Sequence, residues 1–251
     1  MSQDGKHAFI AAYGGGTLSA LSIQADGRLS PDSDTFRHSG SGPNKKRQST
    51  SHMHFSQSVG KWLYACDLGS DEVLQLRQNA STGDIEKIGS GRTPPGAGPR
   101  HFVPSRDGKF LYVNNEMGMS VSVFEIASDG ALILRHTVPT LADSVPQESW
   151  STAAIKMHPR LPILYVSNRG HNSITTFEMK TDGNLRAVQG TALAVVEPRD
   201  FAIDSSGEWI VVGGQKSNAV QTLSLDPISG IPKDSGHRAK IFKPVCLVFR
   251  P

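Results

Sequence analysis

Apolar and polar residues alternate along this chain in short runs, and one arrangement of runs recurs five times. Each unit begins with a short, largely apolar stretch, and these stretches start at His7, Trp62, Phe110, Ile163 and Trp209. The intervals between these starts are 55, 48, 53 and 46 residues. A repeat of roughly 40 to 50 residues with several strands per unit is typical of β-propeller blades.

The second run of each unit alternates strictly between apolar and polar residues, as SVSVFEI does from Ser120. The other second runs begin at Thr17, Glu72, Ser173 and Ala219. A period of two predicts half-buried β-strands, and we expect almost no helix. Glycine supplies the positive φ that a tight turn needs, and closing turns are predicted at Asp26-Gly27, Thr82-Gly83, Asp129-Gly130, Asp182-Gly183 and Ser229-Gly230.

A further apolar run precedes each unit from the second one onward, near His52, Arg100, Thr152, Pro198 and Lys243. The sequence therefore predicts an all-β fold, a β-propeller of four-stranded antiparallel blades with about five blades in one domain, residues 1–251. The first unit lacks an innermost strand, whereas the run from Pro244 to Phe249 is left over. We expect this run to be a strand that completes an open blade, in a closed five-bladed ring or in part of a larger one.

Polar residues gather where the innermost strand of a blade starts and where the next strand ends. These two points meet at the same end of an antiparallel pair, which is the mouth of the central channel. The residues concerned are His52, His54, Arg100, His101 and Arg199 at the strand starts, and Asp67, Glu116, Asn168 and Arg169 at the returning tips. Arginines grip carboxylate or phosphate, and a glutamate or histidine moves a proton, so the set suits a small anionic metabolite.

A structural interpretation of the same residues stays open. Arg100, Glu116 and Arg169 are also the residue types that tie blades together through ion pairs, and His54 alternates in its strand as a core histidine would. The equivalent tip positions differ from blade to blade, however, and hold Tyr13, Leu68, Glu116, Arg169 and Gln215. Because the residue type at this tip position varies between blades, we expect each blade to contribute a different side chain to one shared site.

Composition narrows the alternatives further. The 251 residues are 37% hydrophobic and carry a net charge of +3, and the one dense basic cluster, Lys45-Lys46-Arg47, is expected to be a solvated loop and not a nucleic-acid site. Cys66 and Cys246 both lie in apolar runs and are predicted to be buried thiols. No residue spacing suggests a metal site or a cofactor. No apolar run is long enough to span a membrane and no signal-peptide pattern follows Met1, so we expect a cytoplasmic location without membrane association.

Several segments resemble the lactonase family of seven-bladed β-propellers, which includes bacterial 6-phosphogluconolactonase and fungal 3-carboxy-cis,cis-muconate lactonizing enzyme. They are AAYGGGTLSAL, GPNKKRQSTSHMH, GPRHFVPSRDGKFLYVNNE, LYVSNRGHNSI and PRDFAID. The resemblance covers nearly the whole chain and implies that about two N-terminal blades of the family are missing here. It also implies a catalytic site formed by His54, Arg100, Glu116 and Arg169, with His52 as the less favoured choice for the histidine.

The resemblance implies lactone chemistry on an anionic substrate and leaves three alternatives. In hydrolysis, Arg100 and Arg169 would hold the substrate and polarise the ring carbonyl, while Glu116 or His54 takes a proton from water. In a carboxymuconate cycloisomerase the same groups would neutralise the carboxylates and shuttle the proton. A non-catalytic binding module is the third alternative. We expect substrate-binding roles for His52, His101, Arg199, Asp67 and Asn168.

Overall fold

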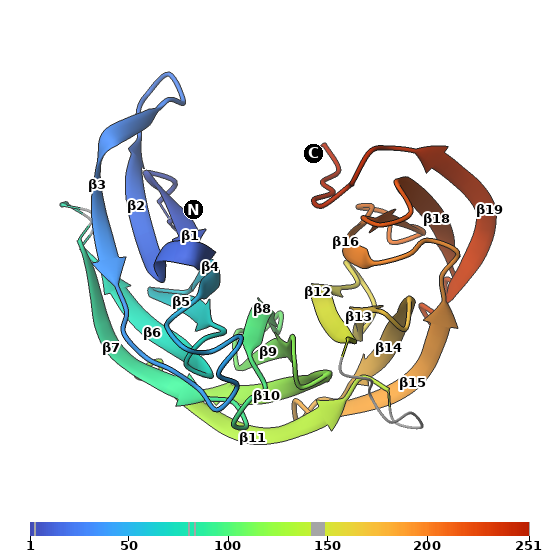
Figure 1. Ribbon diagram of the computed structural model, residues 1–251, viewed down its shortest axis with the longest axis horizontal. Coiled ribbons are helices and arrows are strands. Elements are labelled where there is room, and N and C mark those ends of the chain that lie inside the picture. The colour runs from blue at the N-terminus through green and yellow to red at the C-terminus, as the bar shows by residue number, and fades with distance from the viewer. Residues whose placement is uncertain (3, 80, 83, 142–148, 251) are drawn as a thin grey trace. The chain divides into compact units, whose positions relative to one another are not determined.

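The computed structural model describes residues 1–2, 4–79, 81–82, 84–141 and 149–250 (Figure 1). Within these ranges the chain is built from β-strands, and its helical content is one three-residue 3-10 turn, η1 (Tyr13–Gly15). The expectation of an almost helix-free fold is confirmed. Of the predicted closing turns, Thr82-Gly83 includes Gly83, which lies outside the described residues.

The strands form five antiparallel sheets, each built from consecutive strands (Figure 1). The first sheet has three strands, β1 (His7–Ala12), β2 (Thr17–Ile23) and β3 (Leu29–Arg37). The second contains β4 (Met53–Val59), β5 (Trp62–Asp67), β6 (Glu72–Gln78) and β7 (Ile85–Arg92). The third contains β8 (Pro99–Pro104), β9 (Phe110–Asn115), β10 (Ser120–Ile126) and β11 (Leu132–Pro139). The fourth contains β12 (Ser151–Met157), β13 (Ile163–Arg169), β14 (Ser173–Met179) and β15 (Leu185–Ala192), and the fifth contains β16 (Pro198–Ile203), β17 (Trp209–Gly214), β18 (Ala219–Leu225) and β19 (Pro232–Lys240).

These sheets confirm the predicted blades, including the missing innermost strand of the first one. Strands β1, β5, β9, β13 and β17 begin at the five predicted residues, and so do β2, β6, β10, β14 and β18. These starts could be predicted because a short apolar run and period-2 alternation are both local features of the sequence.

The contacts of the chain divide it into two compact units. Unit 1 contains Met1–Asn115 and Ser122–Arg135, and unit 2 contains Glu116–Val121 and His136–Pro251. The prediction of one domain over the whole chain stays a prediction, and the two units are described separately below.

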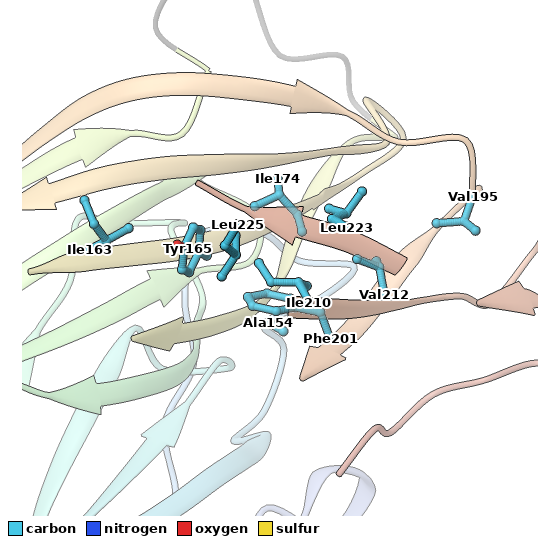
Figure 2. Packing of buried hydrophobic residues seen from close by; sticks show 10 residues of the cluster. All are labelled: Ala154, Ile163, Tyr165, Ile174, Val195, Phe201, Ile210, Val212, Leu223 and Leu225. Carbon is cyan, nitrogen blue, oxygen red and sulfur yellow. The ribbon is translucent and has the colours of Figure 1, made fainter. Parts of the chain in front are cut away.

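The hydrophobic cores lie between neighbouring sheets within each unit. In unit 2, Tyr165 and Ile174 of the fourth sheet pack against Phe201, Ile210 and Leu223 of the fifth sheet (Figure 2). In unit 1, one cluster joins the first and second sheets and another joins the second and third. Burying an aromatic side chain such as Phe201 contributes about 2 to 3 kcal/mol, so packing of one blade on the next is a main source of stability.

A tyrosine on the second strand of a blade also reaches the closing turn of the following blade. The hydroxyl of Tyr64 donates to the carbonyl of Gly130 at 2.7 Å, and that of Tyr165 donates to the carbonyl of Gly230 at 2.6 Å. Gly130 has a φ of 83°, and a Cβ there would collide with the indole of Trp62. Glycine is therefore required at this turn both for its backbone conformation and for the close approach of the neighbouring blade.

The C-terminal segment differs from the prediction, because residues 241–250 contain no strand. Instead, the backbone N–H of Leu247 donates to the Asp200 carboxylate at 2.8 Å, and Pro244 and Leu247 lie against Gly213 of β17. An apolar run becomes a strand only where a partner supplies backbone hydrogen bonds. Here a side-chain carboxylate supplies the contact, so the predicted strand from Pro244 to Phe249 was wrong.

Candidate functional site

Irregularities in the innermost strands carry three of the predicted site residues. The register between the first and second strands of a blade shifts between Met53 and Phe55, between Pro99 and His101, and between Pro198 and Asp200. The residues inside these shifts are His54, Arg100 and Arg199, at equivalent positions in three blades. A β-bulge re-aims its side chain and is common beside active sites. The equivalent shift in the fourth sheet, between Thr152 and Ile155, carries alanines.

The tip turns of the blades share a second backbone feature. The residue directly before β2, β6, β10, β14 and β18 has a positive φ in each case, and these residues are Gly16, Asp71, Met119, Asn172 and Asn218. The side chains of three of them also tie a later segment of chain to the tip, and the first is Asn218, which accepts from the N–H of Lys243 at 3.1 Å. Asn172 accepts from the N–H of Glu197 at 2.9 Å, and Asp71 accepts from the N–H groups of Gly96 and Gly98 at 2.7 and 2.8 Å. These contacts fix the tips that carry the polar residues.

In unit 1, aromatic and histidine rings form one continuous cluster. The ring of Tyr13 stacks on His52, with centroids 4.4 Å apart and an interplanar angle of 12°, and meets His54 edge-on at 5.7 Å. His54 in turn meets His101 edge-on at 5.1 Å. Nη1 of Arg100 lies 3.1 Å from Nε2 of His101, and the arginine side chain is buried. The structure therefore brings four of the predicted residues of unit 1 together, with Tyr13 beside them.

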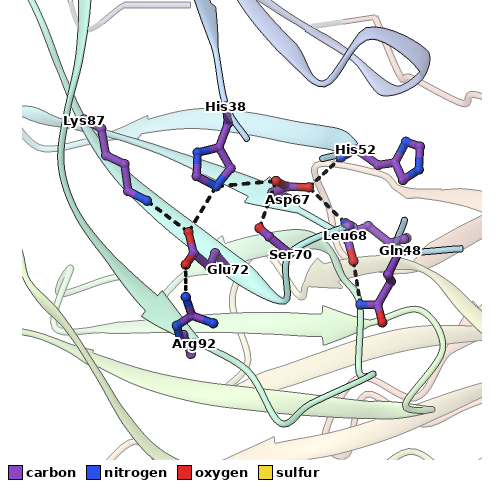
Figure 3. Close-up of polar contacts among 10 residues, drawn as sticks. His38, Gln48, His52, Asp67, Leu68, Ser70, Glu72, Lys87 and Arg92 are labelled. Carbon is purple, nitrogen blue, oxygen red and sulfur yellow. Dashed lines mark hydrogen bonds and ion pairs between the residues drawn. The ribbon is translucent and has the colours of Figure 1, made fainter. Parts of the chain in front are cut away.

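A buried carboxylate holds His52 in this cluster. Asp67 accepts from the backbone N–H of His52 at 2.6 Å, from the N–H of Gly69 at 2.9 Å and from the hydroxyl of Ser70 at 2.9 Å (Figure 3). Nδ1 of His52 also lies 2.9 Å from the carbonyl oxygen of Tyr13. Asp67 is fully buried. Its carboxylate therefore orders the tip turn and positions His52.

Beside Asp67, a second carboxylate is surrounded by cations. Glu72 accepts from Lys87 at 3.0 Å and from Arg92 at 2.5 Å, and Nε2 of His38 lies 3.2 Å from it (Figure 3). Burial raises the pKa of Glu72, but the hydrogen bond and charge of Lys87, with the charges of Arg92 and His38, outweigh burial and lower the pKa below its usual 4.5. This network joins β6 and β7 to the start of the loop that follows β3.

In unit 2, Glu116 and Arg169 form a buried ion pair. Nη2 of Arg169 lies 3.1 Å from Oε2 of Glu116, with side-chain exposures of only 9% and 6%. The same nitrogen donates to the carbonyl of Thr152 at 3.0 Å, whose own N–H donates to the carbonyl of Glu116 at 3.0 Å. Glu197 approaches the other guanidinium nitrogen at 4.0 Å. The start of β12 thus contacts the side chain of Arg169 and the backbone of Glu116.

Two further predicted residues of unit 2 lie in different surroundings. Asn168 is fully buried and donates to the hydroxyls of Ser173 and Thr175 at 3.1 and 2.9 Å, while its Oδ1 has no partner among the described residues. Arg199 is partly exposed in its bulge. Asn168 therefore braces the tip that carries Arg169, and Arg199 keeps a guanidinium close to solvent.

The sequence interpretation missed the contacts of the loop that leads into β4. Arg47, assigned to a solvated basic cluster, donates from Nη2 to the hydroxyl of Tyr13 at 3.2 Å. His38 was not singled out, although it contacts both Asp67 and Glu72. An open cavity of about 670 Å³ borders this loop and is lined by Gly14, Gly15, Arg37, His38, Ser39, Gly40, Ser41, Ser49, Thr50 and Ser51. Asn44 and Gln48, whose side chains can bind backbone, were the available signal for an ordered turn.

The two cysteines differ from each other. Cys66 is buried as predicted, and burial, followed by the nearby Asp67 carboxylate, raises the pKa of its thiol well above the usual range despite the opposing charge of Arg100. Cys246 is exposed, so its predicted burial was wrong, because the segment that carries it is not a strand.

Among the described residues, no group of three His, Cys, Asp or Glu side chains could hold a metal ion. No helix in the described ranges is long and apolar enough to cross a membrane.

Five antiparallel sheets of consecutive strands, with cores between neighbouring sheets and varied polar residues at their tips, define a protein of the β-propeller class. A family model described as "Lactonase, 7-bladed beta-propeller" matches residues 1–249. The chain belongs to this lactonase family.

Similar proteins with known names support the assignment. The chain is 31% identical over 238 residues to a 6-phosphogluconolactonase of Formosa agariphila, covering 92% of this chain and 67% of the relative. It is 28% identical to the 6-phosphogluconolactonase of Bacillus subtilis, covering 99% and 72%. The chain thus spans about two thirds of the length of the curated relatives it matches.

Solved structures show the same fold. The periplasmic gluconolactonase of Pseudomonas aeruginosa matches with a TM-score of 0.88 and 30% identity, covering 97% of this chain and 70% of that structure. A protein from Lactobacillus plantarum matches with a TM-score of 0.92 and 29% identity, covering 98% and 72%.

Proposed function

We propose that this chain is a lactonase that hydrolyses the ring ester of an anionic sugar acid, a substrate like 6-phosphogluconolactone. The family match over residues 1–249 and the relatives named 6-phosphogluconolactonase support the reaction class. We also propose the cytoplasm as its location, although one matched structure is of a periplasmic protein.

The observation that carries this proposal is the pair of bulges that present His54 and Arg100 on either side of His101. Hydrolysis needs a base that takes a proton from water and a cation that stabilises the oxyanion formed at the carbonyl. We assign the base to His54 and the oxyanion contact to Arg100. Water then adds to the carbonyl carbon, the ring C–O bond breaks, and the proton held by His54 passes to the departing ring oxygen.

The pair in unit 2 has proposed roles as well. Arg169 would bind an anionic group of the substrate, and Glu116 would be the alternative proton acceptor. Both side chains are buried, and the carbonyl of Thr152 accepts from the Arg169 guanidinium and helps to orient it; such preorganisation lowers the cost of arranging charge during the reaction. His52, His101, Arg199 and Asn168 are proposed substrate-binding groups, and Asp67 is proposed to act through His52.

The test is acid release from 6-phosphogluconolactone, corrected for spontaneous hydrolysis, with the mass of the product recorded. Addition of one water identifies hydrolysis, whereas an unchanged mass with a carboxymuconate substrate and loss of its diene absorbance would identify cycloisomerisation instead. Loss of activity is expected for His54→Gln, Arg100→Met, Glu116→Gln and Arg169→Ala, by about 10²- to 10⁴-fold for each residue that moves a proton or stabilises the oxyanion.

Matched controls separate the site from general effects. His237 and Arg28 are exposed residues, so His237→Gln and Arg28→Gln should retain full activity. Circular dichroism and thermal unfolding check that each variant folds. A folded Glu116→Gln or Arg169→Ala protein with full activity would remove that residue from the site, and no acid release by the unaltered chain would reject the lactonase proposal.

A further inference from the structure

One exposed arginine is held beside the histidine cluster of unit 1. The guanidinium of Arg47 donates to the hydroxyl of Tyr13 at 3.2 Å, and the Tyr13 ring contacts both His52 and His54. A single tyrosine therefore separates this cation from the proposed base. An exposed arginine usually samples many rotamers, so a defined contact here needs a structural reason.

That reason lies in the turn that carries the arginine. The backbone N–H groups of Arg47 and Gln48 both donate to the carbonyl of Asn44, at 3.1 and 2.7 Å, and the Asn44 side chain accepts from the N–H of Arg47 at 3.2 Å. The amide oxygen of Gln48 accepts from the N–H of Asn44 at 3.1 Å. The turn is therefore closed by backbone and side-chain bonds at both of its ends.

A buried side chain anchors this turn to the second blade. Gln48 is fully buried, and its Nε2 donates to the carbonyl of Leu68 at 2.9 Å and to the carboxylate of Asp71 at 2.7 Å. Asp71 belongs to the same tip turn that presents Asp67 and positions His52. Arg47 is thus fixed relative to the histidine cluster by a continuous set of hydrogen bonds, although its own side chain faces solvent.

The neighbouring cavity has the charge and chemistry that an anionic sugar derivative needs. Its lining residues, all within the described part of the chain, include Arg37, His38 and hydroxyl side chains, and no Asp or Glu. Ser51 is buried there, and its hydroxyl has no hydrogen-bond partner among the described residues. Arg37 also donates to the carbonyl of Gly15, two residues beyond Tyr13. Hydroxyl and cationic groups around an open space suit a polyol that carries an oxyanion.

We propose that Arg47 is the specificity residue that recognises the phosphate of the substrate, while the reacting ester lies at His54. The inference rests on the proposed lactonase function and deepens it. The guanidinium of Arg47 presents several N–H donors in a plane, which suits a phosphate monoester. The contact with Tyr13 fixes the direction of that plane. Arg47 makes no contact with the reacting carbonyl in this assignment, so it discriminates between substrates and does not take part in proton transfer.

The experiment compares two lactones that differ only in the phosphate. For Arg47→Gln, kcat/KM with 6-phosphogluconolactone is expected to fall about 10- to 100-fold, as for loss of a hydrogen bond between charged groups. With unphosphorylated gluconolactone the loss is expected to be at least about tenfold smaller, because that substrate offers no phosphate to the guanidinium. Tyr13→Phe, which removes the hydroxyl and keeps the ring, should produce a smaller loss confined to the phosphorylated substrate.

Lys46→Gln is the matched control, because Lys46 lies in the same turn and carries the same charge at an exposed position. Equal losses with both lactones in Arg47→Gln would overturn the inference and indicate a structural role. Equal losses of kcat/KM in Lys46→Gln and Arg47→Gln would also overturn it. The losses would then result from the lower positive charge of the turn and not from a specific contact of Arg47.

A binding measurement separates this inference from the proposed reaction. Calorimetry with 6-phosphogluconate and gluconate does not depend on turnover. The unaltered chain is expected to bind the phosphorylated acid more tightly, and Arg47→Gln is expected to lose that difference. If the chain releases no acid from either lactone but retains this difference, the reaction is wrong and the phosphate site stands. If it binds both acids equally, the phosphate site is wrong.

Discussion

Glu72 in unit 1 and Glu116 in unit 2 are both buried carboxylates near blade tips, but their cations differ. Glu72 contacts Lys87 and Arg92, whose side chains are 33% and 72% exposed. Glu116 contacts Arg169, whose side chain is only 9% exposed. The first carboxylate therefore belongs to an ion network that remains in contact with water, whereas the second belongs to a pair withdrawn from it.

The difference bears on why each pair is present. A pair with an exposed cation loses little solvation when it forms and contributes modestly to stability. A pair with both partners buried has lost the solvation of two charges, and apolar residues of similar volume would often stabilise the fold as well. The Glu116 and Arg169 pair is therefore poorly explained by stability alone, which agrees with its proposed catalytic role.

The largest effect is expected when the buried pair loses one partner. Arg169→Met removes the buried cation that pairs with Glu116 at 3.1 Å and should lower the free energy of unfolding by about 3 to 5 kcal/mol. The double variant Glu116→Leu/Arg169→Met should recover most of that loss, because it removes both charges. Denaturant unfolding measures both values, with Arg186→Met at an exposed pair as the control.

Arg169→Met would contradict the difference from the Glu72 network if it lost less than about 1 kcal/mol, because losses of that size are typical of surface ion pairs.

An intermediate effect is expected for Glu72→Gln, about 1.5 to 3 kcal/mol at neutral pH, because charged hydrogen bonds are lost. The pKa of Glu72 is lowered in the folded protein, so its ionised form stabilises the fold above its usual pKa of 4.5. This contribution disappears as the pH falls through the lowered folded-state value. The free energy of unfolding of Glu72→Gln should therefore decline less steeply than that of the unaltered chain from about pH 5 to about pH 3.

Glu86 pairs with Arg77 at a mostly exposed site, so Glu86→Gln is the control for the pH series. Parallel pH profiles for Glu72→Gln and the unaltered chain would show that the cations around Glu72 do not favour its ionised form.

The smallest effect is expected for Arg92→Gln, below about 1 kcal/mol, because the guanidinium is exposed and Lys87 remains beside Glu72. The loss should shrink further when salt is added, since exposed pairs are screened. Unfolding at low and high ionic strength measures this, and a salt-independent loss as large as that of Arg169→Met would erase the distinction between the two networks.

Much of the fold could be predicted because strands and tight turns are encoded locally. The starts of β5, β9 and β13 follow from short, largely apolar runs. The run from Pro244 to Phe249 has the same character, yet it is not a strand, since a strand also requires a partner. The same difference left Cys246 exposed.

The sequence predicted which residues could form the candidate site better than it predicted how their side chains are arranged in space. The resemblance and the tip positions pointed to His54, Arg100, Glu116 and Arg169, and their joint action on one substrate stays a proposal. The bulges at His54 and Arg100 depend on the pairing of two strands, so they cannot be predicted from one stretch of sequence. Arg47 was interpreted as a solvated residue because its contact with Tyr13 joins residues 34 positions apart.

By itself the sequence determined the strand pattern, the tight turns and the residues available for chemistry, because each depends on neighbours within a few positions. Only the tertiary structure decided which charges are buried together, which side chains the bulges re-aim and which loop arginine is held beside the histidines. Those outcomes depend on the register between strands and on contacts between blades, where distant segments set the burial and the hydrogen-bond partners of each group.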